Sequence, residues 1–290
     1  MPPDPKHMKR FFLLICALGL VACDPTISTM PSERPETMEN FTPTSKIEPA
    51  PTSTQLQPTL TPVPTATQIP FDVCVPLEDE TFESLPQILW NPLDIPPFGS
   101  DGGHHGLDFG YYQKGERLSI LGIEIYAILA GETVLTLEDA IPYGYTILIE
   151  TPLSSLPTSL QETLLAQYLP IPQDIIYKGQ CPEVIPPNLT GNLSVYHLYA
   201  HMEAPSSFNP GDAVSCSEKI GTVGNTGRSS NPHLHLETRL GPSGAKLTNM
   251  AYYEVSYSDE QRSNYCLWRM SGYFQLFDPF ILFNAVLGGT

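Results

Sequence analysis

Two short segments alternate histidine with apolar residues, and this pattern constrains the fold more than any other feature of the chain. They are residues 194–202 (SVYHLYAHM) and 232–239 (PHLHLETR). Successive side chains of a β-strand point to opposite faces, so a period of two places the histidines on one face. Both segments are therefore expected to be strands of a sheet that carries histidines on one side.

The alternation also assigns individual residues to a face. In residues 232–239, both histidines share a face with Glu237, and the leucines between them point into the core. In residues 194–202, one face is expected to hold His197, Tyr199 and His201.

Further strands are predicted by short alternating or β-branched runs that Gly, Pro and Asn interrupt. These runs are residues 123–130, 132–137, 145–151 and 219–223. One amphipathic helix is expected at residues 158–168 and a second short helix near 279–287. We therefore predict a mainly β fold, a compact antiparallel sheet with one or two short helices.

Residues 152–192 and 241–275 interrupt this pattern with irregular, Pro-rich or aromatic sequence. Loops of this length without regular structure are uncommon within a compact core, so both stretches are predicted to be insertions. Such loops often carry selectivity.

The first 70 residues lack the composition of a packed domain. Residues 1–23 combine a basic start with an apolar run of 12 residues, which is typical of an export signal and too short to span a bilayer. Residues 24–70 contain 10 Pro, 11 Thr and 4 Ser, a composition that stays extended and cannot offset its ordering entropy. We expect a linker there and a folded domain at residues 71–290.

The export signal ends in Leu20, Val21, Ala22 and Cys23, which resembles the lipobox of bacterial lipoproteins. The resemblance implies that Cys23 is acylated, so the chain is expected to be anchored to the extracytoplasmic side of a membrane. The alternative is an ordinary signal peptide that contains a cysteine by chance. In both cases the chain leaves the cytoplasm.

Four further cysteines form an even set in an exported chain, which favours two disulfides. A thiolate zinc site needs closer spacing, such as CxxC. Three pairings are open for Cys74, Cys181, Cys216 and Cys266.

The formal net charge is −17, and residues 24–290 hold 30 acidic against 11 basic residues, or −19. Charge of this sign repels nucleic acid and anionic wall polymers. We expect no nucleic-acid partner, and any anionic target must be held by local contacts.

A third histidine motif is GGHHGLDFG at residues 102–110, where His104 and Asp108 have HxxxD spacing. The nearby glycines disfavour a helix, so a loop that leads into a strand is expected. The three motifs hold six of the seven histidines of the chain. Three N or O ligands leave one zinc position open, where a bound water reaches a pKa of roughly 7. Further histidines can then move its proton.

Together with the turn GTVGNTG before HLH, these motifs resemble those of the lysostaphin-type, or LytM-type, zinc endopeptidases, which cleave peptide cross-links in peptidoglycan. The resemblance covers most of residues 90–282 outside the two insertions, and implies the β fold of that family. Asn231-Pro232 departs from the more usual Gly-Pro. This departure and the insertions bear on substrate preference.

The resemblance implies zinc ligands His104, Asp108 and His235, with His201 and His233 as the catalytic pair. In the family, a zinc-bound water attacks the scissile carbonyl while the two histidines position the water and shuttle its proton. We therefore expect hydrolysis of peptide bonds in stem peptides or cross-bridges of peptidoglycan, with Zn²⁺ as cofactor.

Other residues of the motifs leave alternatives open. His105 is expected to support the site, with the alternative that it replaces His104 as ligand. His197 is expected at a cleft wall or on the surface. Tyr199 either donates to an oxyanion or is buried with a satisfied hydroxyl. Glu237 either orients a ligand histidine or is a solvated strand carboxylate.

Two other functions remain as alternatives. Some LytM-type domains have lost zinc and activate cell-wall amidases instead, and a structural wall-binding module could also hold a zinc. The five ligand and catalytic positions are all kept here, which favours the enzyme over both.

Overall fold

The computed structural model describes residues 71–189 and 191–288, and its centre is an antiparallel sheet. The predicted export signal, Cys23 and the whole predicted linker lie outside the described residues. Neighbouring strands follow the order β1-β2-β9-β6-β5-β4-β7, and β10 pairs with β9. These strands are β1 (Leu89–Asn91), β2 (Leu107–Phe109), β4 (Gly131–Ala140), β5 (Gly144–Pro152), β6 (Leu193–Met202), β7 (Ala213–Val214), β9 (Leu234–Pro242) and β10 (Gln275–Leu276).

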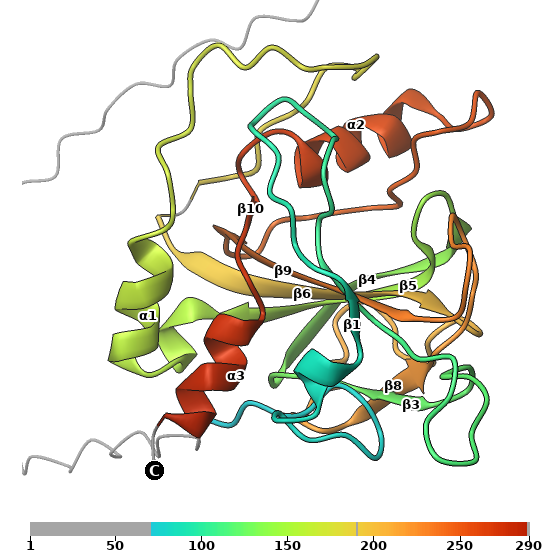
Figure 1. The fold of residues 1–290 in the computed structure, drawn as a ribbon. Helices are drawn as coiled ribbons and strands as arrows, with labels where there is room; N and C mark the ends of the chain where they lie inside the picture. The colour runs from blue at the N-terminus through green and yellow to red at the C-terminus, as the bar shows by residue number, and fades with distance from the viewer. Residues whose placement is uncertain (1–70, 190, 289–290) are drawn as a thin grey trace, which may run out of the picture. The chain divides into compact units, whose positions relative to one another are not determined.

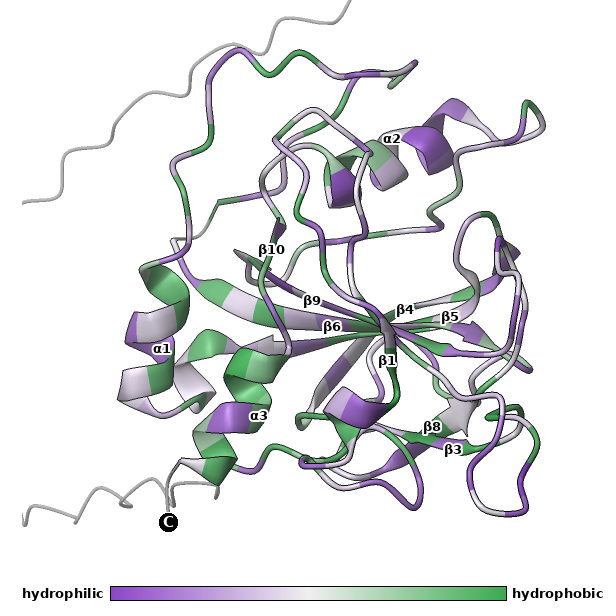
Figure 2. Ribbon diagram, viewed as in Figure 1, coloured by the Kyte–Doolittle hydropathy of each residue, from purple (hydrophilic) through white to green (hydrophobic). Residues whose placement is uncertain are grey.

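Three helices and a strand pair pack around this sheet (Figure 1). The strand pair is β3 (Glu124–Tyr126) with β8 (Lys219–Thr222), and it lies on the opposite face of the sheet from α2 (Asp259–Arg269). The other helices are α1 (Thr158–Leu165) and α3 (Phe280–Leu287), of which α3 is mainly apolar (Figure 2).

Both faces of the sheet are buried because each supports its own core. Ile147 and Ile149 of β5 join the core on the face that β3 and β8 cover, together with Tyr199 of β6. Leu148 and Leu198 join the core beneath α2, which contributes Trp268. The central strands are therefore apolar on both sides, apart from the histidines and the residues that hold them.

The mainly β antiparallel fold is confirmed, and the predicted strands are found with small differences at their ends. The run at 123–130 is the largest exception, because β3 ends at Tyr126. Of the two predicted helices, α3 is present. Helix α1 begins at Thr158 as predicted but ends at Leu165 instead of residue 168, and Leu165 is 45% exposed.

The expected number of helices was too low, because α2 was not predicted. Its signal is a capping box: the Ser258 side chain accepts from the Gln261 N–H, and the Gln261 side chain accepts from the Ser258 N–H. Asp259 and Glu260 in the first turn and Arg269 in the last suit the helix dipole.

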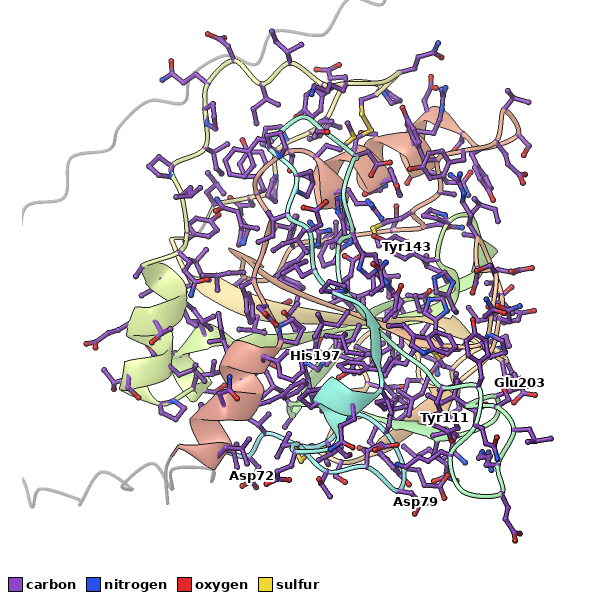
Figure 3. The ribbon with its side chains drawn as sticks, in the orientation of Figure 1. Asp72, Asp79, Tyr111, Tyr143, His197 and Glu203 are labelled. Atoms are coloured by element: carbon purple, nitrogen blue, oxygen red, sulfur yellow. A yellow bond between two sulfur atoms is a disulfide. The ribbon has the colours of Figure 1, made fainter. Side chains whose placement is uncertain are left out.

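The four cysteines form two disulfides, as expected, and the pairing is Cys74–Cys216 and Cys181–Cys266. The second bond joins the two predicted insertions, because Cys181 lies in 152–192 and Cys266 in α2 (Figure 3). Within the described ranges, no helix has the length and apolar character of a bilayer span.

Candidate metal centre

Strand β9 lies between β2 and β6 and brings the histidine motifs together. Asp108 of β2 is directly opposite His235 of β9. Residues opposite each other in an antiparallel pair project from the same face, and here Asp108 Oδ1 lies 2.7 Å from His235 Nδ1. The strand register therefore places these two predicted ligands together.

His104 reaches the same carboxylate from the loop before β2, as the sequence predicted. Its backbone forms an isolated bridge with Asp94, and its Nε2 lies 3.0 Å from Asp108 Oδ1. Gly106 allows this approach, because a Cβ there would lie 2.5 Å from the Leu236 carbonyl oxygen and 3.0 Å from the His235 ring. The loop can thus pass close to His235 only without a side chain at position 106.

His201 reaches this face through a β-bulge. The prediction that it lies on the same strand face as Tyr199 was wrong. Between the pairs Tyr145–Met202 and Ile147–Tyr199, β6 contains one more residue than β5. His201 itself has φ 59°, the left-handed region. Bulges re-aim side chains, and this one turns the His201 ring to within 4.8 Å of the His233 ring and 5.7 Å of the His235 ring. Tyr199 stays on the opposite face.

Three of these histidines donate their outer ring nitrogen to a backbone carbonyl. His104 Nδ1 lies 2.8 Å from the Pro92 oxygen, His201 Nδ1 2.8 Å from the Thr226 oxygen, and His233 Nδ1 2.8 Å from the Asn231 oxygen. A carbonyl can only accept, so the proton lies on Nδ1 and the Nε2 lone pair faces inward. For His104 and His233, that inward nitrogen faces Asp108 Oδ1 at 3.0 and 3.4 Å.

A lone pair that faces a carboxylate oxygen is repelled unless a proton or a metal cation lies between the two atoms. Ligand atoms around a tetrahedral zinc lie roughly 3.3 Å apart when the bonds are about 2.0–2.1 Å. One atom from each of His104, Asp108 and His235 falls within 4.8 Å of the others, and the same holds for His201, His233 and His235. The residues present therefore fit a divalent metal with nitrogen and oxygen ligands.

His235 is held from its other side by Glu237, whose Oε1 lies 3.2 Å from His235 Nε2. Glu237 is fully buried and accepts from Tyr143 Oη at 2.8 Å, Arg239 Nε at 2.9 Å and Trp268 Nε1 at 3.1 Å. Of the two alternatives for Glu237, the solvated carboxylate is therefore wrong. Such a contact fixes the orientation of a ligand ring.

Charges around the centre follow from these contacts. Burial raises the pKa of Asp108, but the contacts with His104, His233 and His235 outweigh it and hold the pKa well below its usual range. Burial lowers the pKa of His201 to about 3, so this ring is neutral.

The structure also decides the remaining open residues. His105 is buried, and its two ring nitrogens lie 2.9 Å from Arg239 Nη2 and 3.1 Å from the Gly102 oxygen, so it supports the loop that carries His104. Tyr199 is buried with a satisfied hydroxyl, which accepts from the Ile128 N–H at 2.7 Å. His197 was expected at a cleft wall or on the surface, and this was wrong, because it is fully buried.

A cavity of about 260 Å³ opens at the centre. Six of its lining residues were not predicted from the sequence: Pro142, Tyr143, Arg228, Ser229, Ser230 and Arg269. Tyr143 lies in the turn between β4 and β5, and Arg269 lies in α2, the helix that was not predicted. Figure 3 shows Tyr143 on the side of the sheet that α2 covers and His197 on the other side.

Comparison with known proteins adds one sequence match. Residues 189–248 match the model of "Peptidase family M23". The matched segment runs from the start of β6 past the end of β9, so it contains His201, His233 and His235 but neither His104 nor Asp108. No curated protein matches the chain.

Solved structures give distant similarities. The catalytic domain of the antimicrobial peptidase lysostaphin from Staphylococcus simulans has 17% identity and a TM-score of 0.35, over 71% of this chain and 99% of that one. An M23 peptidase candidate from Pseudomonas aeruginosa has 19% identity and a TM-score of 0.31, over 76% of this chain and 57% of that one. A zinc-containing peptidase from Vibrio cholerae has 17% identity and a TM-score of 0.29, over 59% of this chain and 34% of that one. The chain thus spans little more than half of the Pseudomonas chain and a third of the Vibrio chain.

Proposed function

We propose that this chain is a zinc-dependent endopeptidase that hydrolyses peptide bonds in peptidoglycan. The observation that carries the proposal is the convergence on Asp108 Oδ1 of His104 Nε2 and His235 Nδ1, with His233 Nε2 at 3.4 Å. A set of three N and O ligands is the kind that catalytic zinc sites use, since it leaves a position free. The M23 segment and the likeness of the motifs to lysostaphin-type enzymes support the choice of peptide substrate.

The roles follow from where each side chain lies. In this proposal His104, Asp108 and His235 hold the metal, which would acidify a water molecule to give a nucleophile near neutral pH. His201 and His233 are fixed through Nδ1, so their Nε2 atoms can hold and transfer a proton beside the nucleophile. Because the His201 Nδ1 proton is given to the Thr226 carbonyl, the Nε2 lone pair is free to accept that proton.

We also propose that the chain acts outside the cytoplasm, anchored through acylated Cys23. Two disulfides support export, since such bonds persist in oxidising compartments. The Pro/Thr-rich residues 24–70 would then separate the peptidase from the membrane surface.

Purified protein supplied with zinc tests the proposal on isolated cell walls. We expect about one zinc per chain by metal analysis and release of soluble fragments, whose mass spectra identify the bond that is cut. His235→Ala should abolish both zinc binding and release. Hydrolysis retained by His235→Ala would refute the ligand assignment.

An amidase activator, the alternative function, gives a different result in the same assay. It would release nothing alone and would stimulate release when a cell-wall amidase is added. If this result is obtained with protein that binds zinc, the activator function would replace the proposed hydrolysis.

A further inference from the structure

A second cavity, of about 890 Å³, lies next to the metal centre. Both cavities share a wall formed by Arg228, Ser229 and Ser230. The second cavity continues to Tyr253 and Glu254 in the 241–275 insertion. A peptide bound across the metal centre would therefore extend along Arg228.

Arg228 lies on the loop that fixes both proposed catalytic histidines. Two residues before it, the Thr226 carbonyl accepts from His201 Nδ1 at 2.8 Å, and the next residue, Ser229, has its Oγ 3.2 Å from His233 Nδ1. The Arg228 N–H donates to the Pro142 carbonyl at 2.8 Å. The loop that carries Arg228 is thus held in a fixed position relative to the metal centre.

Gly227 allows this loop to pass so close to its neighbours. It has φ 70°, and a Cβ there would lie 2.3 Å from Gly144 N and 2.5 Å from the Pro142 oxygen. The backbone beneath Arg228 is therefore tightly packed, while the Arg228 side chain is exposed.

The guanidinium of Arg228 is held but not neutralised. Its Cζ lies 5.1 Å from the centre of the Tyr253 ring, and the Tyr253 hydroxyl hydrogen-bonds to Asp101 and Tyr265. Across the described residues, no carboxylate forms a salt bridge with Arg228, and Glu254, which lines the same cavity, contacts Ser256 Oγ at 3.5 Å.

Arg269 differs from Arg228 although it also lines the metal centre. Its Nε lies 2.6 Å from Asp101 Oδ1 and its Nη1 3.9 Å from Glu237 Oε1, so its charge is already compensated. In a chain with 31 acidic and 14 basic residues, an uncompensated arginine at the cleft is a local exception to the prevailing charge.

We propose that Arg228 is the specificity residue of a subsite for a carboxylate of the peptide substrate. A planar guanidinium matches a carboxylate through two parallel hydrogen bonds, which an amide cannot reproduce. The inference rests on the proposed peptidase function. It deepens that function by naming the substrate class, peptides with a free carboxylate near the cleaved bond, in place of uncharged peptides such as oligoglycine.

The carboxylate has two possible sources, an acidic side chain of the peptide or its C-terminal α-carboxylate. Three forms of one cross-linked stem peptide distinguish them: all carboxylates free, only the C-terminal carboxylate amidated, and only the side-chain carboxylates amidated. For purified wild-type protein with zinc, we expect tight binding of the free form and weaker binding, by about tenfold, of the form that lacks the recognised carboxylate.

Arg228→Gln should remove this preference, so that it binds the free form about tenfold more weakly and all three forms alike. The affinity of Arg228→Lys for the free form should lie between those of the wild type and Arg228→Gln, because lysine keeps the positive charge but cannot form the two parallel hydrogen bonds. Arg262→Gln is the matched control: Arg262 pairs with Asp259 on α2 and lines neither cavity. In kinetics, Arg228→Gln should raise KM and leave kcat nearly unchanged.

The outcomes separate the subsite from the proposed reaction. Equal binding of the three peptides by wild-type protein, or an equal effect of Arg228→Gln and Arg262→Gln, would overturn the subsite even if hydrolysis occurs. An Arg228-dependent preference in binding, with no cleavage of any peptide, would support the subsite and overturn the hydrolysis.

Discussion

Glu237 Oε1 lies 3.2 Å from His235 Nε2, on the opposite side of the ring from the proposed metal position. Partners of this kind typically affect metal affinity 10–100-fold. We therefore expect Glu237→Gln to weaken zinc binding by about tenfold or more, measured by competition with a chromophoric chelator.

The same substitution should also lower the free energy of unfolding. Arg239 is buried and its Nη2 lies 2.9 Å from Glu237 Oε2, so Glu237→Gln leaves its charge uncompensated, at a cost of about 3 kcal/mol. Glu138→Gln, an exposed position on β4, is the control and should change neither quantity. Unchanged zinc affinity in Glu237→Gln would contradict the role assigned to Glu237.

His201 combines a left-handed backbone with a proposed catalytic role, and the two can be separated. Asn tolerates φ near 59°, whereas a β-branched residue does not. His201→Asn should keep zinc and thermal stability but lose turnover by at least about a hundredfold. His201→Val should lose turnover and also lower the melting temperature. Loss of zinc from His201→Asn, equal to that from His235→Ala, would show that His201 is a ligand.

The sequence predicted the strands well because their periodicity was strong, and motif resemblance selected the side chains that the structure brings together around Asp108. Register explains why two of these side chains meet: Asp108 opposes His235 across β2 and β9, and no local pattern encodes that pairing. The sequence shows that residue 106 is a glycine, but it does not predict that the loop passes close to His235, because that approach depends on tertiary contacts.

Alternation misplaced His201 because a bulge adds one residue and shifts every side chain beyond it to the other face. Burial explains the error at His197. A histidine on a strand face resembles a surface residue unless its partners are known, and those partners, Thr151 and Tyr199, come from two strands. The capping box of α2, in contrast, was readable from Ser258 and Gln261.

His197 should make the fold sensitive to acid. Tyr199 Oη accepts from Ile128 and so donates to His197 Nδ1 at 2.8 Å, while Nε2 donates to Thr151 Oγ1 at 3.1 Å. This network requires a neutral ring, and burial lowers the pKa of His197 to about 3.

The unfolded chain, with a histidine pKa of about 6.5, binds more protons than the folded one between pH 6.5 and 3. The stability from neutral His197 is present above pH 6.5 and is lost as the pH falls through this window. His197→Gln cannot titrate, so urea unfolding between pH 7.5 and 4 should show a shallower loss of stability than in the wild type. Equal slopes would show that the pKa of His197 is the same in the folded and the unfolded chain, and would contradict the prediction.

The two disulfides provide a matched pair for testing how α2 supports the metal centre. They close sequence separations of 142 and 85 residues, for which chain entropy predicts about 4–5 kcal/mol each. Both Cys74→Ala/Cys216→Ala and Cys181→Ala/Cys266→Ala should therefore lower the melting temperature by similar amounts.

Only the second pair should change zinc affinity. Cys266 lies on α2 two residues before Trp268, which donates to Glu237 at 3.1 Å, and three residues before Arg269, which pairs with Asp101 next to the GGHHG loop. Without the bond to Cys181, α2 is less restrained, and zinc affinity should fall by up to about tenfold. Cys74–Cys216 joins the first described residues to the loop before β8, so its loss should leave zinc affinity unchanged. Equal effects of the two pairs on zinc affinity would show that α2 acts on the centre only through global stability.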